Sequence, residues 1–194
     1  MDDIKAIETE YKGYRFRSRL EARWAVFFET ASIPWEYEPE GIDLGTDGGY
    51  LPDFLIRVEF IGVMGEHIYR DLWNDTFIEV KPYALVPKQR DRLFTIAKHT
   101  SYVLCTDPPG AYRLWHMSPT DDEDSRAEAA FFYDLGDSVA ICLMPSTEEA
   151  YKTTYNLHQA CLHSNKLGSA YLAARQARFE HGQFGPPSDW SGNG

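Results

Sequence analysis

Two short segments place acidic and basic side chains among apolar residues. Asp53 follows a proline at the start of the apolar run 50–60, and Glu79 and Lys81 alternate with apolar residues in 76–81. An ionised group is costly to bury unless it is paired or binds a metal ion. Carboxylates on neighbouring strands can share a divalent cation. The pattern therefore favours a functional site over an ordinary surface strand.

Carboxylates that hold a divalent cation suit metal-assisted hydrolysis, and hydrolysis of a phosphodiester is one case of it. That reaction needs a cation that polarises the phosphate and a hydroxide formed near neutral pH. Mg2+ (or Mn2+) prefers oxygen ligands, and Asp53, Glu79 and the backbone carbonyl of Val80 would supply them. Lys81, two residues beyond Glu79, returns to the same face of the strand. Its ammonium would orient the attacking water, stabilise the pentavalent charge or, with its pKa lowered near the cation, act as a base.

Hydrophobic periodicity predicts the elements that must position these residues. A helix begins after Ser18, with an apolar stripe that continues to Ala31, and ends before Pro34. Strands are expected at 35–37, 50–60, 76–81 and 101–105, a helix at 87–99, further strands at 112–117, 129–135 and 139–144, and a largely helical segment at 147–180 with a break near Ser164 or Gly168. A helix between two strands is a crossover that makes them parallel. The strand 76–81 should therefore be central.

This order of elements, with acids on the first helix and on the second and third strands, resembles the PD-(D/E)xK nuclease superfamily. The resemblance covers about residues 11–106, and the matching catalytic residues are Glu21, Asp53, Glu79 and Lys81. It implies an α/β fold: a mixed central β-sheet flanked by helices, the restriction-endonuclease-like core, with additional C-terminal strands and a long C-terminal helical segment. Within the superfamily, the strings 16–18, 35–39 and 52–54 resemble phage Holliday-junction resolving endonucleases and the end-cleaving nuclease subunit of some bacterial transposons.

Glu21 has two interpretations. It lies at the margin of the apolar stripe of the first helix, where a side chain can reach a sheet edge and serve as a metal ligand or orient one. Ser18 and Glu21 also form the S-x-x-E pattern of a capping box, in which the glutamate binds the backbone at the start of the helix. The two roles could alternate with metal occupancy.

The composition indicates one main domain. The chain has 194 residues, 43% of them hydrophobic, with no apolar run of the length that spans a bilayer and no signal-peptide stretch. We therefore expect a cytoplasmic protein with no membrane partner. The expected organisation is a nuclease-like core at 11–106, C-terminal strands and helices packed on it at 107–182, and a flexible tail at 183–194.

The net charge of −11 argues against a general basic surface for nucleic acid. DNA would then be bound through local patches. The candidates are the cations near the first helix, the polar start of the helix at 87–99, where a helix N-terminus favours anions, and a basic pair on the last helix. These residues are Arg17, Arg19, Lys88, Gln89, Arg175 and Arg178.

The leading hypothesis is a Mg2+-dependent DNA nuclease, of a kind used by phages or mobile elements in recombination or repair. An alternative, motivated by the acidic charge, is a catalytically silent protein of nuclease type that acts as an interaction module or inhibitor. A third is a nuclease subunit that is active only with a partner recombinase or helicase. A homodimer would supply two sites if both DNA strands are cut.

Overall fold

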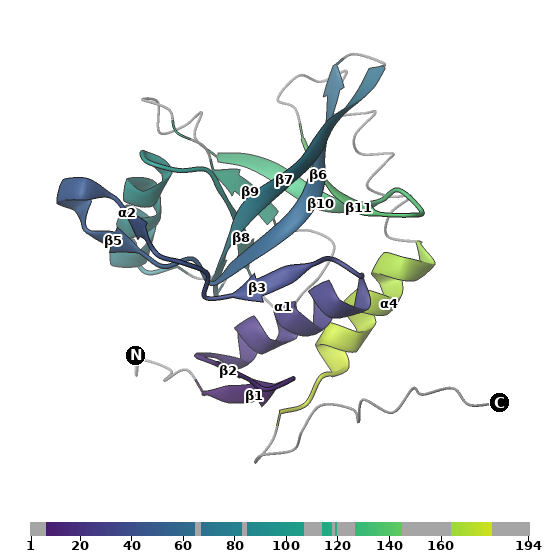
Figure 1. Cartoon of the computed structure of the whole chain (residues 1–194), viewed down its shortest axis with the longest axis horizontal. Helices are drawn as coiled ribbons and strands as arrows, with labels where there is room; N and C mark the ends of the chain where they lie inside the picture. The colour runs from purple at the N-terminus through teal and green to yellow at the C-terminus, as the bar shows by residue number, and fades with distance from the viewer. Residues whose placement is uncertain are drawn as a thin grey trace.

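The computed structural model describes residues 7–64, 67–82, 85–106, 114–117, 119, 127–144 and 164–179. A small hairpin and a helix lead into one large sheet, and a second long helix follows it (Figure 1). The strands are β1 (Thr9–Tyr11), β2 (Tyr14–Phe16), β3 (Trp35–Tyr37), β4 (Ile42–Asp43), β5 (Gly49–Tyr50), β6 (Phe54–Met64), β7 (His67–Lys81), β8 (Tyr102–Thr106), β9 (Leu114–Met117), β10 (Ala127–Asp134) and β11 (Val139–Leu143). The helices are α1 (Arg19–Thr30), the 3-10 helix η1 (Gly45–Asp47), α2 (Pro87–Ala97) and α4 (Asn165–Gln176).

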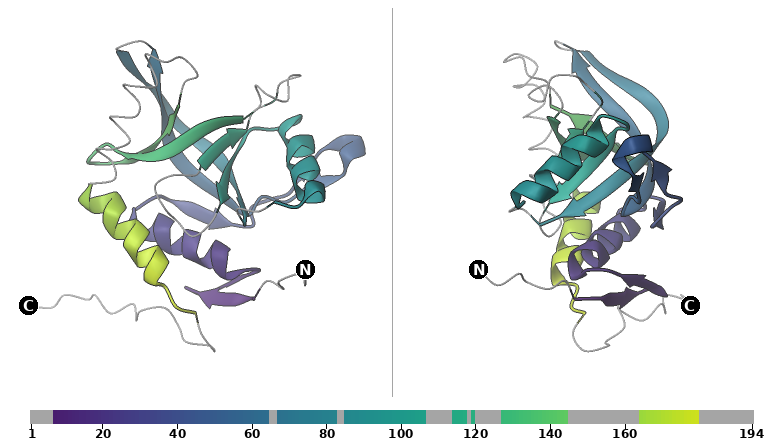
Figure 2. Two further views of the ribbon diagram at one scale, coloured as in Figure 1. Left: turned by 180° about the vertical axis from the view of Figure 1, so that it is seen from behind. Right: turned by 90° about the vertical axis from the view of Figure 1, so that its left-hand side faces the viewer.

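The main sheet closes on itself as a six-stranded barrel. Its order is β6, β7, β8, β9, β10 and β11, and β11 pairs again with β6. The pairs β7–β8 and β11–β6 are parallel, and the other four are antiparallel. Figures 1 and 2 show the long β6–β7 hairpin rising above the rest of the barrel.

The barrel closes because the outer edge of β6 serves two partners. Residues 54–56 pair with β3, and residues 59–61 pair with β11. A register irregularity between Val58 and Phe60 separates the two halves, and such bulges bend a strand and increase its twist. The expected α/β fold, a mixed central sheet flanked by helices, is therefore wrong. The chain is mostly strand, with three α-helices among the described residues, and its sheet is a closed barrel.

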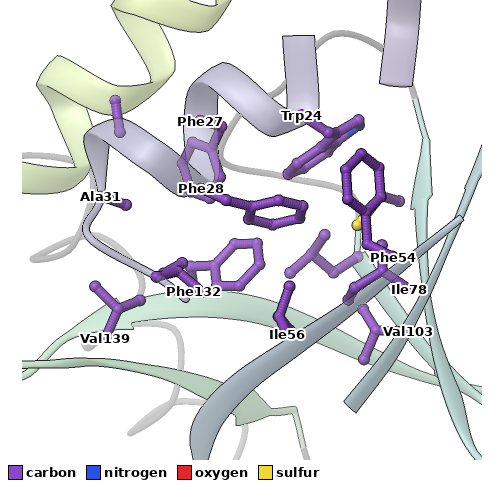
Figure 3. Packing of buried hydrophobic residues seen from close by; sticks show 14 of the residues in the cluster. Trp24, Phe27, Phe28, Ala31, Phe54, Ile56, Ile78, Val103, Phe132 and Val139 are labelled. Carbon is purple, nitrogen blue, oxygen red and sulfur yellow. The ribbon is translucent and has the colours of Figure 1, made fainter. Parts of the chain in front are cut away.

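The apolar stripe of α1 forms the main core with the sheet (Figure 3). Trp24, Phe27 and Phe28 follow the helical spacing that gathers side chains on one face, and all three are buried. The ring of Phe27 lies 5.0 Å from that of Phe132, and the ring of Phe28 lies 5.4 Å from that of Phe54. Each such side chain contributes about 1.5–3 kcal/mol by burial. This packing fixes α1, and with it the start of the helix, relative to the first residues of β6.

The helix α4 lies against α1 (Figures 1 and 2). The rings of Phe27 and Tyr171 stack with their centroids 4.7 Å apart. The helix begins after Ser164, which caps it, and Gly168 is helical, so of the two places expected for a break only Ser164 stands at a helix end. It ends at Gln176, earlier than predicted. The rest of the segment expected to be helical, at 147–163 and at 180, and the expected tail lie outside the described residues.

A second apolar cluster holds α2 on the other face of β7 and β8. Leu93 and Ile96 of the helix pack with Tyr102 of β8 and with Tyr50 of β5. The hydroxyl of Tyr102 donates to the backbone carbonyl of Leu93 at 2.9 Å. The predicted crossover is confirmed, because α2 connects β7 to a parallel neighbour, and β7 lies between β6 and β8.

The first strands were also predicted near their observed places. The strand 35–37 is confirmed as β3, while the expected strand 76–81 is only the end of β7. Residues 62–75, which lie outside the predicted strands, contribute to the long β6–β7 hairpin. None of the helices within the described ranges is both long and apolar enough to cross a membrane.

Candidate functional site

Asp53 lies immediately before β6 and is almost fully buried, with 2% of its surface exposed. Its backbone N–H donates to the carbonyl of Ile78 at 3.1 Å, which ties the residue to β7. Its carboxylate accepts a hydrogen bond from the backbone N–H of Val80 on Oδ2 at 2.7 Å. Its other oxygen, Oδ1, accepts from the guanidinium of Arg17. Both oxygens of the buried carboxylate are therefore engaged.

Glu79 and Lys81 project from the same face of β7. Ile78 and Val80 point into the core with α1, so strand alternation sends Glu79 and Lys81 to the opposite face. Glu79 is buried, with 6% of its surface exposed, whereas the side chain of Lys81 is 26% exposed. The two side chains form an ion pair between the ammonium and Oε1 of Glu79.

The ammonium of Lys81 lies close to Asp53, Glu79 and the Val80 carbonyl, the groups near the end of β7 that the sequence suggested as metal ligands. Besides its ion pair with Glu79, it donates to the backbone carbonyl of Val80 at 3.3 Å and lies 3.7 Å from Oδ2 of Asp53. Three oxygen-bearing groups from two strands thus converge on one cationic atom. Strand pairing brings them together, because Asp53 adjoins the residue of β6 that is paired with Ile78.

Burial and the charges of the cluster shift the pKa values of Asp53 and Lys81. Burial, and then the negative charge of Glu79, raise the pKa of Asp53 to about 7 against the opposing effects of Lys81 and of the Val80 N–H. Burial lowers the pKa of Lys81, but the charges of Asp53 and Glu79 outweigh this effect and hold its pKa above the ordinary value. Without a metal ion, Lys81 is therefore an ammonium group at neutral pH and not a base.

Tyr50 is a member of the site that the sequence did not reveal. It lies in β5, with 5% of its surface exposed, and its hydroxyl donates to Oε2 of Glu79 at 3.1 Å. Burial and the charge of Glu79 raise the pKa of the Tyr50 phenol, so it remains a hydrogen-bond donor. The contact orients Glu79 from the side opposite Lys81. A single tyrosine at the start of the expected strand 50–60 carries no local pattern that would have indicated this role.

Glu21 caps its own helix. Its Oε1 accepts from the hydroxyl of Ser18 at 2.7 Å, and its backbone N–H donates to that hydroxyl at 3.2 Å. Its Oε2 accepts from the backbone N–H of Arg17 at 3.0 Å and from the hydroxyl of Tyr37 at 2.7 Å. The capping interpretation therefore describes the observed contacts, with the amide of Arg17 in place of that of Ser18. Within these contacts Glu21 reaches Asp53 only through Arg17.

Arg17 links this cap to the acidic cluster. Its Nη2 donates to Oδ1 of Asp53, and its Nε lies 2.9 Å from Oε1 of Glu38. Its side chain is 52% exposed, so the guanidinium spans the boundary between the buried carboxylate and solvent. Glu38 has a left-handed backbone, with φ of 47°, and its N–H donates to the carbonyl of Asp53 at 3.0 Å. The sequence suggested Arg17 only as a surface contact for DNA.

The oxygen donors fit a small hard cation. Mg2+ is commonly held by one or two carboxylates, with water and substrate phosphates completing its shell. Asp53, Glu79 and the Val80 carbonyl would hold the ion, since all three already reach one ammonium. Across the described residues, no group of three or more His, Cys, Asp or Glu side chains is arranged to hold a metal. Glu21, suggested as a further ligand, uses both carboxylate oxygens in the helix cap.

The other residues suggested for DNA binding lie on α1, on α2, on α4 and just after α4. Lys88 is exposed at the start of α2, while the side chain of Gln89 accepts from the Val86 N–H and caps that helix. Arg19 is half-buried. Arg175 and Arg178 are both exposed, but α4 ends at residue 176, so the predicted basic pair on one helical face is wrong.

Comparisons of the chain with protein-family models, with curated proteins and with solved structures found no significant match.

Proposed function

We propose that this protein is a Mg2+-dependent or Mn2+-dependent DNA nuclease that hydrolyses phosphodiester bonds. The observation that carries the proposal is the convergence of two buried carboxylates, Asp53 and Glu79, with the Val80 carbonyl on the ammonium of Lys81. Burying this many charged groups is unfavourable for the fold. A buried acid with a raised pKa beside a second buried acid and a lysine is typical of sites that do chemistry.

The order of these residues supports the same activity. The chain resembles the PD-(D/E)xK nucleases in the order of four features. These are an acid on α1, a Pro-Asp before β6, a Glu-x-Lys at the end of β7 and a crossover helix after it. The likeness concerns the site and the elements α1, β6, β7, α2 and β8. It does not extend to the closed barrel, which differs from the sheet that this family led us to expect.

Each residue of the cluster has a distinct part. A bound divalent ion would polarise the phosphate and supply a hydroxide near neutral pH. Asp53 and Glu79 would hold the ion, and the hydrogen bond from Tyr50 fixes the orientation of the Glu79 carboxylate. Lys81, held as a cation, offsets the charge that develops on the phosphate oxygens and positions the attacking water.

The test is a cleavage assay with purified protein. Supercoiled plasmid, linear duplex, single-stranded and branched DNA are incubated with Mg2+ or Mn2+, and products are resolved on gels. Glu79→Gln and Lys81→Met should each lower the rate by about a hundredfold or more. Glu36→Gln and Lys98→Met change exposed residues of the same types on β3 and just after α2 and should cleave as the wild type does. Cleavage that survives Glu79→Gln or Lys81→Met would refute the proposal.

A second candidate follows from the ion pairs themselves. Both candidate metal carboxylates are already neutralised by cations of the chain, Asp53 by Arg17 and Glu79 by Lys81, and the net charge of −11 disfavours free DNA binding. These features suit a catalytically silent interaction protein, or a subunit that needs a recombinase or helicase. Calorimetry with Mg2+ or Mn2+ distinguishes the silent interaction protein from the partner-dependent subunit. Ion binding without cleavage indicates the partner-dependent subunit, and no ion binding indicates the silent protein.

A further inference from the structure

We propose that Arg17 is an internal counter-ion of the carboxylate site, which a divalent ion displaces and which then binds a phosphate of the DNA. The inference rests on the proposed function, because it concerns the same site. It assigns Arg17 a part in substrate binding and Glu21 the part of a positioning residue that acts through Arg17.

The first support is how Arg17 is anchored. Its backbone N–H donates to Oε2 of Glu21 and to the hydroxyl of Tyr37, both at 3.0 Å. Glu21 is in turn held by the hydroxyls of Ser18 and Tyr37 at the start of α1. The backbone of Arg17 is thus fixed to a buried network, while its side chain is half exposed. A fixed backbone with an exposed guanidinium allows the side chain to change rotamer without disturbing the core.

The second support is the position of Arg17 on Asp53. Oδ2 of Asp53 accepts from the backbone N–H of Val80, which the strand holds in place, whereas the partner of Oδ1 is a half-exposed side chain, so Oδ1 is the oxygen whose partner a metal ion can displace. Arg17 occupies Oδ1. Two cations on one oxygen repel each other strongly in a partly buried site. Binding of a divalent ion therefore requires the guanidinium to leave Oδ1.

The third support is what the released guanidinium would meet. Glu38 is its other partner and remains at its side, with 34% of the side chain exposed. A guanidinium binds phosphate through two parallel hydrogen bonds, which is the geometry of many phosphate-binding arginines. At the exposed rim of the site it would face an incoming DNA strand. In a chain of net charge −11, such a local cation is the kind of contact that phosphate binding requires.

The experiment compares Arg17→Gln with Arg15→Gln, a matched change at an exposed arginine of β2 that pairs with Glu8. Mn2+ is titrated into each full-length protein without DNA, by calorimetry. Removing the competing cation should tighten Mn2+ binding by about threefold to thirtyfold in Arg17→Gln, an estimate for one partly screened charge. The affinity for a fluorescent oligonucleotide in Ca2+ should fall about tenfold. Arg15→Gln should leave both affinities unchanged.

Arg17→Lys keeps the charge but not the planar fork. It should bind Mn2+ as the wild type does and bind the oligonucleotide more weakly, which separates charge from geometry. Equal or weaker Mn2+ binding by Arg17→Gln, with a thermal melt that shows a folded protein, would overturn the inference while leaving the nuclease proposal intact. If the wild type itself binds no Mn2+, both proposals fail. If Arg17→Gln binds Mn2+ more tightly and binds DNA unchanged, the phosphate-binding part is refuted.

Discussion

Asp53→Asn should change how the stability of the protein depends on pH. The folded state raises the pKa of Asp53 from 3.8 to about 7, so the folded protein holds this proton more tightly than the unfolded chain does. Stability from this group is fully present below pH 3.8 and is lost as the pH rises through 7. The whole shift corresponds to about 4 kcal/mol, of which about 2.5 kcal/mol falls between pH 5 and pH 8.

Asparagine removes this titration with little change in shape, and its amide oxygen can still accept from the Val80 N–H. The free energy of unfolding of Asp53→Asn minus that of the wild type should therefore increase by about 2.5 kcal/mol from pH 5 to pH 8. Urea denaturation at four pH values, in EDTA, measures this difference. The ion pair with Arg17 depends on the ionisation of Asp53, so its effect is already contained in the folded-state pKa and adds no separate slope.

The control is Asp137→Asn, which changes an exposed aspartate in the turn between β10 and β11 and should show a flat difference. A flat difference for Asp53→Asn as well would refute the reasoning that burial and Glu79 raise this pKa. Because the two acids interact, the measured midpoint belongs to the pair. In Mg2+ at pH 8, the proposed ion binding should raise the melting temperature of the wild type but not of Asp53→Asn.

Three further predictions concern the supports of the site and the barrel. Tyr50→Phe should weaken Mn2+ binding about tenfold in calorimetry by removing the donor to Glu79, whereas Tyr102→Phe, which loses a bond to backbone, should leave it unchanged. Ser18→Ala should lower the free energy of unfolding by about 1 kcal/mol in urea through loss of the α1 cap, and an unchanged midpoint would contradict the capping role. Ile141→Val should lower the free energy of unfolding by about 1 kcal/mol in the same assay, because Ile141 is fully buried in β11, the strand that closes the barrel on β6.

The local elements could be predicted because their signals are local. Helix α1 is indicated by its capping residue Ser18 and by the spacing of Trp24, Phe27 and Phe28, and α2 is indicated by the proline at its start. Each of these signals acts within a few residues. The approach of Asp53 to Glu79 could be predicted because one acid directly precedes β6 and the other lies on its neighbour β7. Each of these inferences needs only periodicity and strand alternation.

Closure of the barrel could not be predicted in this way. The seam joins residues 59–61 to residues 140–142 in parallel, and a parallel pair has no turn sequence that announces it. The contacts of Tyr50 with Glu79 and of Arg17 with Asp53 were missed for a related reason, since they bridge separations of 29 and 36 residues. Such contacts depend on how whole elements pack.

The pairing of β6 with β11 also determines when the barrel can close during synthesis of the chain. β6 begins directly after Asp53, yet its partner β11 is made about eighty residues later. At roughly 5–20 residues per second, the ribosome adds β11 some 4–16 seconds after the far half of β6. During that interval, residues 59–61 present an unpaired strand edge, which is a surface prone to aggregation. A nascent chain that already carries Glu21, Asp53, Glu79 and Lys81 therefore has these side chains before the barrel can close, and the cleavage proposed above would be delayed until the C-terminal strands have emerged.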